Sequence, residues 1–144
     1  MRLDFLILAD KAEAIGGKLY LMGGGFDRVG MTALPGPARF DVAMGLLVGY
    51  NETNLKHGFE LRCEDPDGNL VLPAVQGTFE VGRPAGMTAG SEQRALMVFG
   101  GPFTFQATGD YCWVVALDGE RQPATRFRIE RAQLVGPVAP PRRD

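Results

Sequence analysis

The sequence has 144 residues, of which 45% are hydrophobic and 22% charged, and its formal net charge is −2. Length and composition are ordinary for one globular domain with a sizeable core, and they exclude a collagen-like or wholly disordered chain. A protein with this nearly neutral charge lacks the positive field through which proteins bind nucleic acid or anionic membranes nonspecifically, so we expect neither as a partner.

The N-terminal segment shows no export signal. Its apolar run FLILA stops at Asp10, whereas a signal peptide needs about 7–15 apolar residues. No run approaches the roughly 18 apolar residues of a membrane helix. Two cysteines, Cys63 and Cys112, are too few for a disulfide framework. We therefore expect a cytoplasmic protein with reduced thiols.

The first expected elements are a strand over residues 5–9 and a short helical turn over residues 11–15. Both faces of the strand are apolar, so protein should cover both. Asp10 is suited to cap the helical turn, Glu13 stands where a capping box places its acidic residue, and a Gly-Gly pair follows. The turn is too short to shield the whole strand.

A glycine-rich segment, GGGFDR at residues 23–28, comes next and invites comparison with phosphate-binding loops. A dinucleotide fingerprint needs a glycine at its sixth position, where Arg28 stands, and a P-loop lysine is followed by Ser or Thr, whereas Leu19 follows Lys18. We therefore predict a bulge or bend between strands, where glycines adopt backbone conformations that other residues resist.

The rest of the chain shows the period-two alternation of strands with one buried face. Such strands are expected over residues 40–48, 59–63, 79–81, 103–105 and 127–129. The segment YCWVVAL at residues 111–117 is apolar on both faces, which indicates a central strand. The clearest hairpin turns are Asp65-Pro66-Asp67-Gly68 and Asp118-Gly119.

One-sided strands with short connections indicate antiparallel pairing. We predict an all-β protein, an antiparallel β-sandwich of about eight to ten strands with a Greek-key, immunoglobulin-like or C2-like topology; a closed barrel is the second possibility. The single domain is expected to span residues 1–135, and residues 136–144, rich in Pro and Arg, are expected to form a flexible tail.

Candidates for nucleophilic catalysis are few, because Ser91 is the one serine and His57 the one histidine. Cys63 shares a strand with His57, but their spacing puts the two about 20 Å apart. Pairing of His57 with Cys112 stays open, although a buried cysteine more commonly acts as a small apolar residue. We expect no catalytic residues and no cofactor.

The sequence Asp65-Pro66-Asp67-Gly68-Asn69 resembles the opening of a calcium loop, but no glutamate stands where the loop should close. Carboxylates from separate loops can still converge, so Asp65, Asp67 and Asp118 remain a possible metal site, although a hairpin turn explains the first two. A zinc site lacks support from any Cys-x-x-Cys spacing.

Arginines gather near the end of the chain, at Arg121, Arg126, Arg128 and Arg131. Nucleic-acid platforms need aromatic side chains on the same face as the basic ones, whereas Phe127 alternates away from its neighbours. We interpret this cluster as a solvated outer face.

Three segments carry a family resemblance: LDFLILADKAEAIGGKLYLMGGGFDRV, EVGRPAGMTAGSEQ and GDYCWVVALDGE. They resemble an uncharacterised family of short bacterial proteins, a domain of unknown function, and the likeness extends to about residue 131. The resemblance implies a small, single-domain, all-β protein without an assigned activity or catalytic residues. Tyr111 also stands in a setting similar to the tyrosine corner of Greek-key sandwiches.

We therefore expect a non-enzymatic protein-interaction or assembly module. If Phe5 and Ile7 face the core, Leu6 and Leu8 face away, and another protein or a second copy should cover them, giving a homo-oligomer. The alternative is a small-ligand or calcium-binding β-sandwich. An enzyme that uses acids such as Asp27 is the third hypothesis.

Overall fold

The computed structural model describes residues 1–132, which form twelve strands and one short 3-10 helix. The elements are β1 (Arg2–Ile15), β2 (Lys18–Gly24), β3 (Arg28–Met31), β4 (Gly36–Ala38), β5 (Asp41–Gly49), η1 (Tyr50–Glu52), β6 (Lys56–Glu64), β7 (Val75–Glu80), β8 (Glu92–Gly100), β9 (Phe103–Phe105), β10 (Gly109–Leu117), β11 (Glu120–Arg121) and β12 (Thr125–Arg131).

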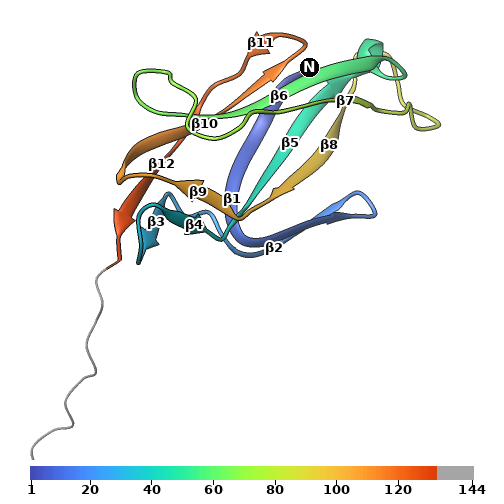
Figure 1. Cartoon of the computed structure of the whole chain (residues 1–144). Helices are drawn as coiled ribbons and strands as arrows, with labels where there is room; N and C mark the ends of the chain where they lie inside the picture. Colours follow the sequence, from blue (N-terminus) through green and yellow to red (C-terminus); the bar gives the residue numbers. More distant parts are fainter. Residues whose placement is uncertain (133–144) are drawn as a thin grey trace, which may run out of the picture.

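The strands form two main sheets that pack face to face as a β-sandwich, as predicted (Figure 1). One sheet has the order β2-β1-β5-β8 and is called the four-stranded sheet below; the second has the order β3-β12-β10-β6-β7, with β11 beside β10. β4 pairs with β9 apart from both. Pairing is antiparallel except between β3 and β12, which run parallel. Four strands of two to four residues bring the total above the expected eight to ten.

The core between the sheets is built around an aromatic cluster. Phe40 is 2% exposed, and its ring centroid lies 5.0 Å from that of Phe103, 6.1 Å from Phe127 and 6.4 Å from Trp113. Rings of this size each remove a large apolar area from water and favour the tilted contacts seen here. Alternation along β5 supplies the opposing aliphatic side chains, so the core forms as the sequence pattern predicted.

The helical turn expected over residues 11–15 is wrong, because β1 continues as one strand to Ile15. Gly16 and Gly17 have φ values of 58° and 75°, which fit a two-residue hairpin turn. That turn sends the chain back as β2, with Ile15 opposite Lys18. Cross-strand pairing therefore overrides the local capping signal.

Other local predictions are confirmed. The Asp65 carboxylate accepts hydrogen bonds from the backbone N–H groups of Asp67 and Asn69 at 3.0 and 2.9 Å, which fixes a turn. Gly23, near the end of β2, and Gly25, between β2 and β3, have positive φ where the chain bends toward β3. The domain bounds 1–135 stay a prediction, and the expected tail, residues 136–144, lies outside the described residues. No helix within residues 1–132 has the length and apolarity to cross a bilayer.

Candidate interaction surface

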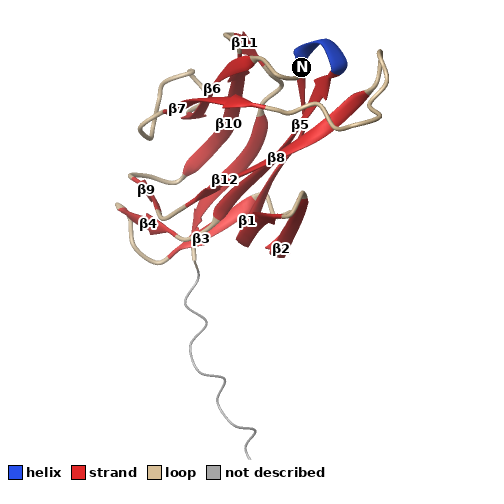
Figure 2. Cartoon of the chain, turned by 90° about the vertical axis from the view of Figure 1, so that its right-hand side faces the viewer, coloured by secondary structure: helices blue, strands red, loops and turns tan. Residues whose placement is uncertain are grey.

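A hairpin formed by the second half of β1 and by β2 projects from the sandwich. β1 pairs with β5 from Arg2 to Ala9, whereas from Lys11 to Ile15 its partner is β2. In Figure 1 the two strands turn together along the lower right of the molecule, and Figure 2 views them from that side. A two-stranded hairpin is marginally stable by itself, so its junction with the sheet matters.

Asp41 fixes this junction. Its Oδ2 accepts a hydrogen bond from the backbone N–H of Ala12 at 2.9 Å, and Asp41 is 8% exposed. Lys11 Nζ lies 3.9 Å from the same carboxylate oxygen. Ala9, Ala12 and Ala43 pack together beside it, where larger side chains would hold the strands apart. The bend of β1 is therefore a built feature of the fold.

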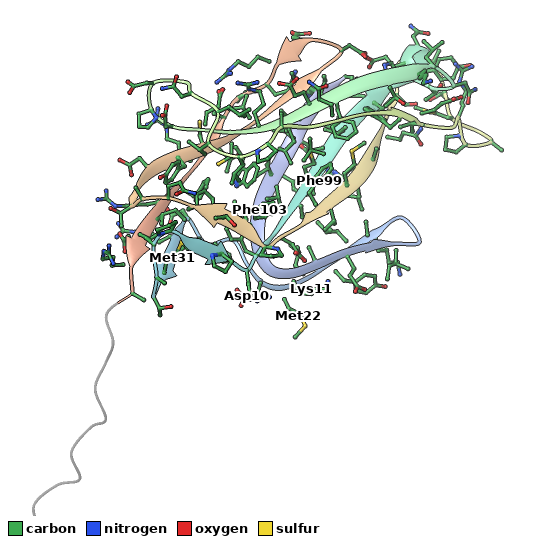
Figure 3. All side chains as sticks on the ribbon, in the orientation of Figure 1. Asp10, Lys11, Met22, Met31, Phe99 and Phe103 are labelled. Carbon is green, nitrogen blue, oxygen red and sulfur yellow. The ribbon has the colours of Figure 1, made fainter. Side chains whose placement is uncertain are left out.

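Both faces of the β1–β2 hairpin carry apolar side chains, and the second face also carries charged ones. Strand pairing places one set of side chains on each face, with Ala12, Ala14, Leu19 and Leu21 on the first face and Lys11, Glu13, Ile15, Lys18, Tyr20 and Met22 on the second. The exposed fractions are 72% for Met22, 58% for Ile15, 55% for Tyr20 and 38% for Leu21. Figure 3 shows Met22 pointing away from the body of the protein.

The outer face of the four-stranded sheet continues this apolar surface. Leu19 and Val98 pack on the buried alanines at the base of the hairpin. Farther along the sheet, the Phe5 ring lies over Gly45, where any side chain would clash with it. Arg94 covers part of that ring, with its guanidinium carbon 5.9 Å from the ring centroid. The hairpin is consequently the least covered part of the surface.

The prediction that Leu6 and Leu8 form the interface is wrong. They are 7% and 2% exposed and belong to the core, whereas Phe5 and Ile7 are the half-buried residues of the opposite face. A strand that is apolar on both faces gives no sign of which face turns inward, and a one-residue shift exchanges them. The outward apolar face exists, but other residues form it.

The possible metal site at Asp65, Asp67 and Asp118, which the sequence left as a weaker alternative to a hairpin turn, does not form. Asp118 accepts a hydrogen bond from the Gly58 N–H at 2.8 Å, near the start of β6, whereas Asp65 directly follows the end of that strand. The Asn69 N–H, with the Asp67 N–H, lowers the pKa of Asp65, as a turn requires. In the part of the chain that the structure describes, no three His, Cys, Asp or Glu side chains are placed to hold a metal ion.

His57 is held between two hydrogen-bond acceptors. Its Nδ1 lies 2.7 Å from Asp118 Oδ2, and its Nε2 lies 2.7 Å from the Glu52 carbonyl oxygen. Because both partners are acceptors, this site favours the imidazolium form, in which both nitrogens donate. The Glu52 carbonyl, against the effect of burial and with help from Asp118, raises the pKa of His57. His57 therefore links η1 to the β10–β11 turn and makes no pair with Cys112.

The two cysteines lie on neighbouring strands but on opposite faces of their sheet. Cys63 faces the core and is 1% exposed, while Cys112 lies opposite Glu64 on the outer face. Burial raises the pKa of the Cys63 thiol strongly, and it raises the pKa of Cys112 as well. Neither thiol is activated as a nucleophile, since the thiolate is the reactive form.

A cavity of about 400 Å³ lies over the outer face of the second sheet. Its lining includes Glu64, Cys112, Arg121 and Arg126. The Glu64 side chain is 2% exposed, and Arg121 Nη1 donates to both of its carboxylate oxygens, at 2.7 and 3.1 Å. Sequence analysis missed Glu64, because it stands at an ordinary polar position of an alternating strand.

The arginine cluster lies on this outer face, as interpreted from the sequence. Arg126 and Arg128 are exposed, and Arg128 Nη1 lies 3.5 Å from Asp110 Oδ1. Arg28 joins them through Glu130, at 3.1 Å. The basic side chains therefore alternate with acidic ones, which fits a solvated surface.

Tyr20, Leu21 and Met22 were also missed. A signal was present, because the run LYLM places apolar residues at consecutive positions and so breaks the alternation of a strand with one buried face. Such a run predicts a strand with apolar side chains on both faces. In a hairpin at the edge of a sheet, some of these apolar side chains are therefore exposed to solvent.

A protein-family model matches most of the chain. A family described as "Family of unknown function (DUF6941)" matches residues 4–130, from the first half of β1 to the end of β12. No curated protein matches the chain.

Proposed function

The chain belongs to the family of unknown function DUF6941, and we propose that it acts as a non-enzymatic protein-interaction or assembly module. The β1–β2 hairpin carries the proposal, because it leaves Ile15, Tyr20, Leu21 and Met22 exposed on a two-stranded projection. A folded chain gains nothing from holding such side chains in water. Contiguous exposed apolar side chains usually mark a surface that another protein covers.

The size of the hairpin bounds the strength of the interaction. Complete burial of a side chain such as Leu or Met contributes about 1.5–3 kcal/mol, whereas association costs an estimated 4–15 kcal/mol. Four partly exposed side chains therefore support an interface of moderate affinity. Backbone hydrogen bonds along an edge strand would add to it.

The contacts of the chemically versatile side chains support the non-enzymatic part of the proposal. His57 uses both ring nitrogens in structural hydrogen bonds, and the thiols of Cys63 and Cys112 have raised pKa values. The two cysteines face opposite sides of one sheet, which suits a reducing compartment, so we place the protein in the cytoplasm.

The test compares the molar mass in solution of the purified wild-type protein with that of a variant whose hairpin surface is no longer apolar. In the variant Tyr20→Lys/Met22→Glu, each new charge faces an opposite one, at Glu13 and Lys11, which preserves the hairpin. The matched control, Leu55→Lys/Leu70→Glu, makes the same change at exposed residues elsewhere.

Light scattering should show wild type and control in a larger assembly, and the hairpin variant as a monomer. If a foreign protein is the partner, wild-type and control baits should retain one that the hairpin variant loses. Equal behaviour of all three proteins in both measurements would overturn the proposal.

Small-ligand binding is a second candidate, supported by the cavity over Glu64. Its volume, about 400 Å³, lies in the range of small-molecule sites, and its buried carboxylate could accept hydrogen bonds from a ligand ammonium group. Thermal unfolding with a series of alkylammonium compounds tests it. A compound should raise the Tm of wild type and leave Glu64→Gln unchanged; no such compound would argue against the site.

A further inference from the structure

β2 is an edge strand whose free side lacks the usual protection. It is the outermost strand of the order β2-β1-β5-β8, and nothing within residues 1–132 pairs with its far side. Its sequence, KLYLMGG, contains no proline and one charged residue, Lys18. Natural proteins shield edges with prolines, charges, bulges or covering segments, because a bare edge is a template for another strand.

The hairpin turn determines which backbone groups of β2 are free. A two-residue turn makes Ile15 and Lys18 a hydrogen-bonded pair, and such pairs recur at every second residue. Tyr20 and Met22 therefore bond to β1. Leu19 and Leu21 direct their N–H and C=O groups to the free side.

We infer that β2 pairs antiparallel with β2 of a second copy of this chain, with Leu21 on the twofold axis. The inference rests on the proposed function and names the partner at that surface. Such an interface is isologous, so each contact occurs twice and the pairing closes at a dimer. The four-stranded sheets of both copies become one continuous sheet.

The charges of the hairpin favour this partner and this register. With Leu21 on the axis, Tyr20 faces the partner's Met22, and β1 adds Glu13 beside Tyr20 and Lys11 beside Met22. The side chains then form rows of four across the joined strands. Each row has Tyr20 and Met22 at its centre, one from each copy, with Lys11 of one copy at one end and Glu13 of the other copy at the other end. The opposite charges at the two ends of a row lie about 14 Å apart, so they favour this register through a weak attraction that salt screens.

The nearest alternative register puts Tyr20 on the axis and is disfavoured. One row would then have Glu13 at one end and the partner's Glu13 at the other, which places like charges on the same face. The Leu21 register also brings Leu21 next to the partner's Leu21, with Ala12 beside each leucine, on the opposite face. Both faces of the joined hairpins thus bury apolar side chains.

Cross-linking tests the register. Directly paired residues in a hydrogen-bonded position have Cα atoms about 5.5 Å apart, within the range of about 4.4–6.8 Å that a disulfide spans. Leu21→Cys should therefore give a disulfide-linked dimer under mild oxidation. In the matched control Lys18→Cys, the two cysteines would lie about 20 Å apart, and that variant should stay uncrosslinked.

A charge exchange tests the same register without a covalent bond. Glu13→Lys puts positive side chains at both ends of each row and should weaken the dimer about threefold at an ionic strength of about 0.01 M, where charges about 14 Å apart are little screened. The matched variant Glu13→Gln removes the charge, leaves Lys11 beside Asp41 undisturbed and should weaken the dimer less than Glu13→Lys does. In the Tyr20 register Glu13→Lys would have no such effect, because it replaces one like pair with another.

The outcomes separate this inference from the proposed function. The expected result is a concentration-dependent dimer in which Leu21→Cys cross-links, Lys18→Cys does not, and Glu13→Lys weakens association more than Glu13→Gln does. A wild-type protein that associates but follows neither pattern overturns the edge pairing alone. A protein that is monomeric by light scattering over a hundredfold concentration range, and that retains no foreign partner through the hairpin, overturns both.

Discussion

The two halves of β1 both contain apolar residues, but they differ in how these residues are covered. In the first half, Leu6 and Leu8 are almost fully buried against the second sheet, and β5 pairs along the strand. In the second half, Ile15 is 58% exposed, and β2 is the neighbour that pairs with it. Apolar residues in the first half build the fold. In the second half, Ala12 packs into the junction with β5, whereas the exposed Ile15 contributes little to the fold, which is why we assign Ile15 to an interface.

The largest effect on folding should come from the first half. Leu8→Ala removes a side chain that is 2% exposed and leaves a cavity between the sheets, which should lower the free energy of unfolding by about 2–5 kcal/mol. Urea unfolding measures this change. A cost below about 1 kcal/mol would show that the halves of β1 differ less than their burial suggests.

The junction between the halves should respond next. Asp41→Ala removes the acceptor for the Ala12 N–H and leaves that group unsatisfied, at a cost of about 1–3 kcal/mol. Hydrogen exchange should show faster opening of residues 10–24 than of β5. Asp41→Asn keeps an acceptor oxygen and serves as the control; equal opening in both variants would deny Asp41 this role.

How much the sequence predicted follows the same division. Alternation located the one-sided strands such as β5, because burial of one face imposes a period of two. The helical reading of residues 11–15 failed, because the capping signal at Asp10 is local while pairing with β2 is set by the Gly16-Gly17 turn. The sequence did not show that Leu6 faces the core, because the strand is apolar on both faces.

The contacts within the candidate sites could not be predicted from the sequence for a related reason. His57 and Asp118 are 61 residues apart, and they meet because β6 and β10 pair in one particular register. No local pattern carries that information. Glu64 likewise becomes buried through Arg121, which a separate hairpin brings to it. The turn at Asp65 was predictable, because its hydrogen bonds connect near neighbours.

The sandwich end near η1 should show a smaller effect, controlled by pH. The pKa of His57 is raised above its ordinary value of 6.5, chiefly by the Glu52 carbonyl. The stabilisation that protonated His57 gives to the folded state is therefore complete below about pH 6.5 and is lost as pH rises through the folded-state pKa. Neutral His57 can donate one hydrogen bond in place of two, a loss of about 0.5–1.5 kcal/mol.

Urea unfolding at a series of pH values measures this dependence. His57→Gln should remove most of it, since glutamine does not titrate. Stability that rises from pH 6 to pH 8 in wild type, but not in His57→Gln, would contradict the assignment of His57 as an imidazolium.

The smallest effect on stability should come from β2, the exposed strand that pairs with the second half of β1. Met22 is 72% exposed, so Met22→Ala should change the free energy of unfolding by less than about 0.5 kcal/mol. The same change should weaken association, because the side chain faces Tyr20 of the second copy in the inferred pairing. Urea unfolding at low protein concentration gives the first quantity, and light scattering gives the second. A variant that loses stability and keeps its association would place Met22 in the fold and the interface elsewhere.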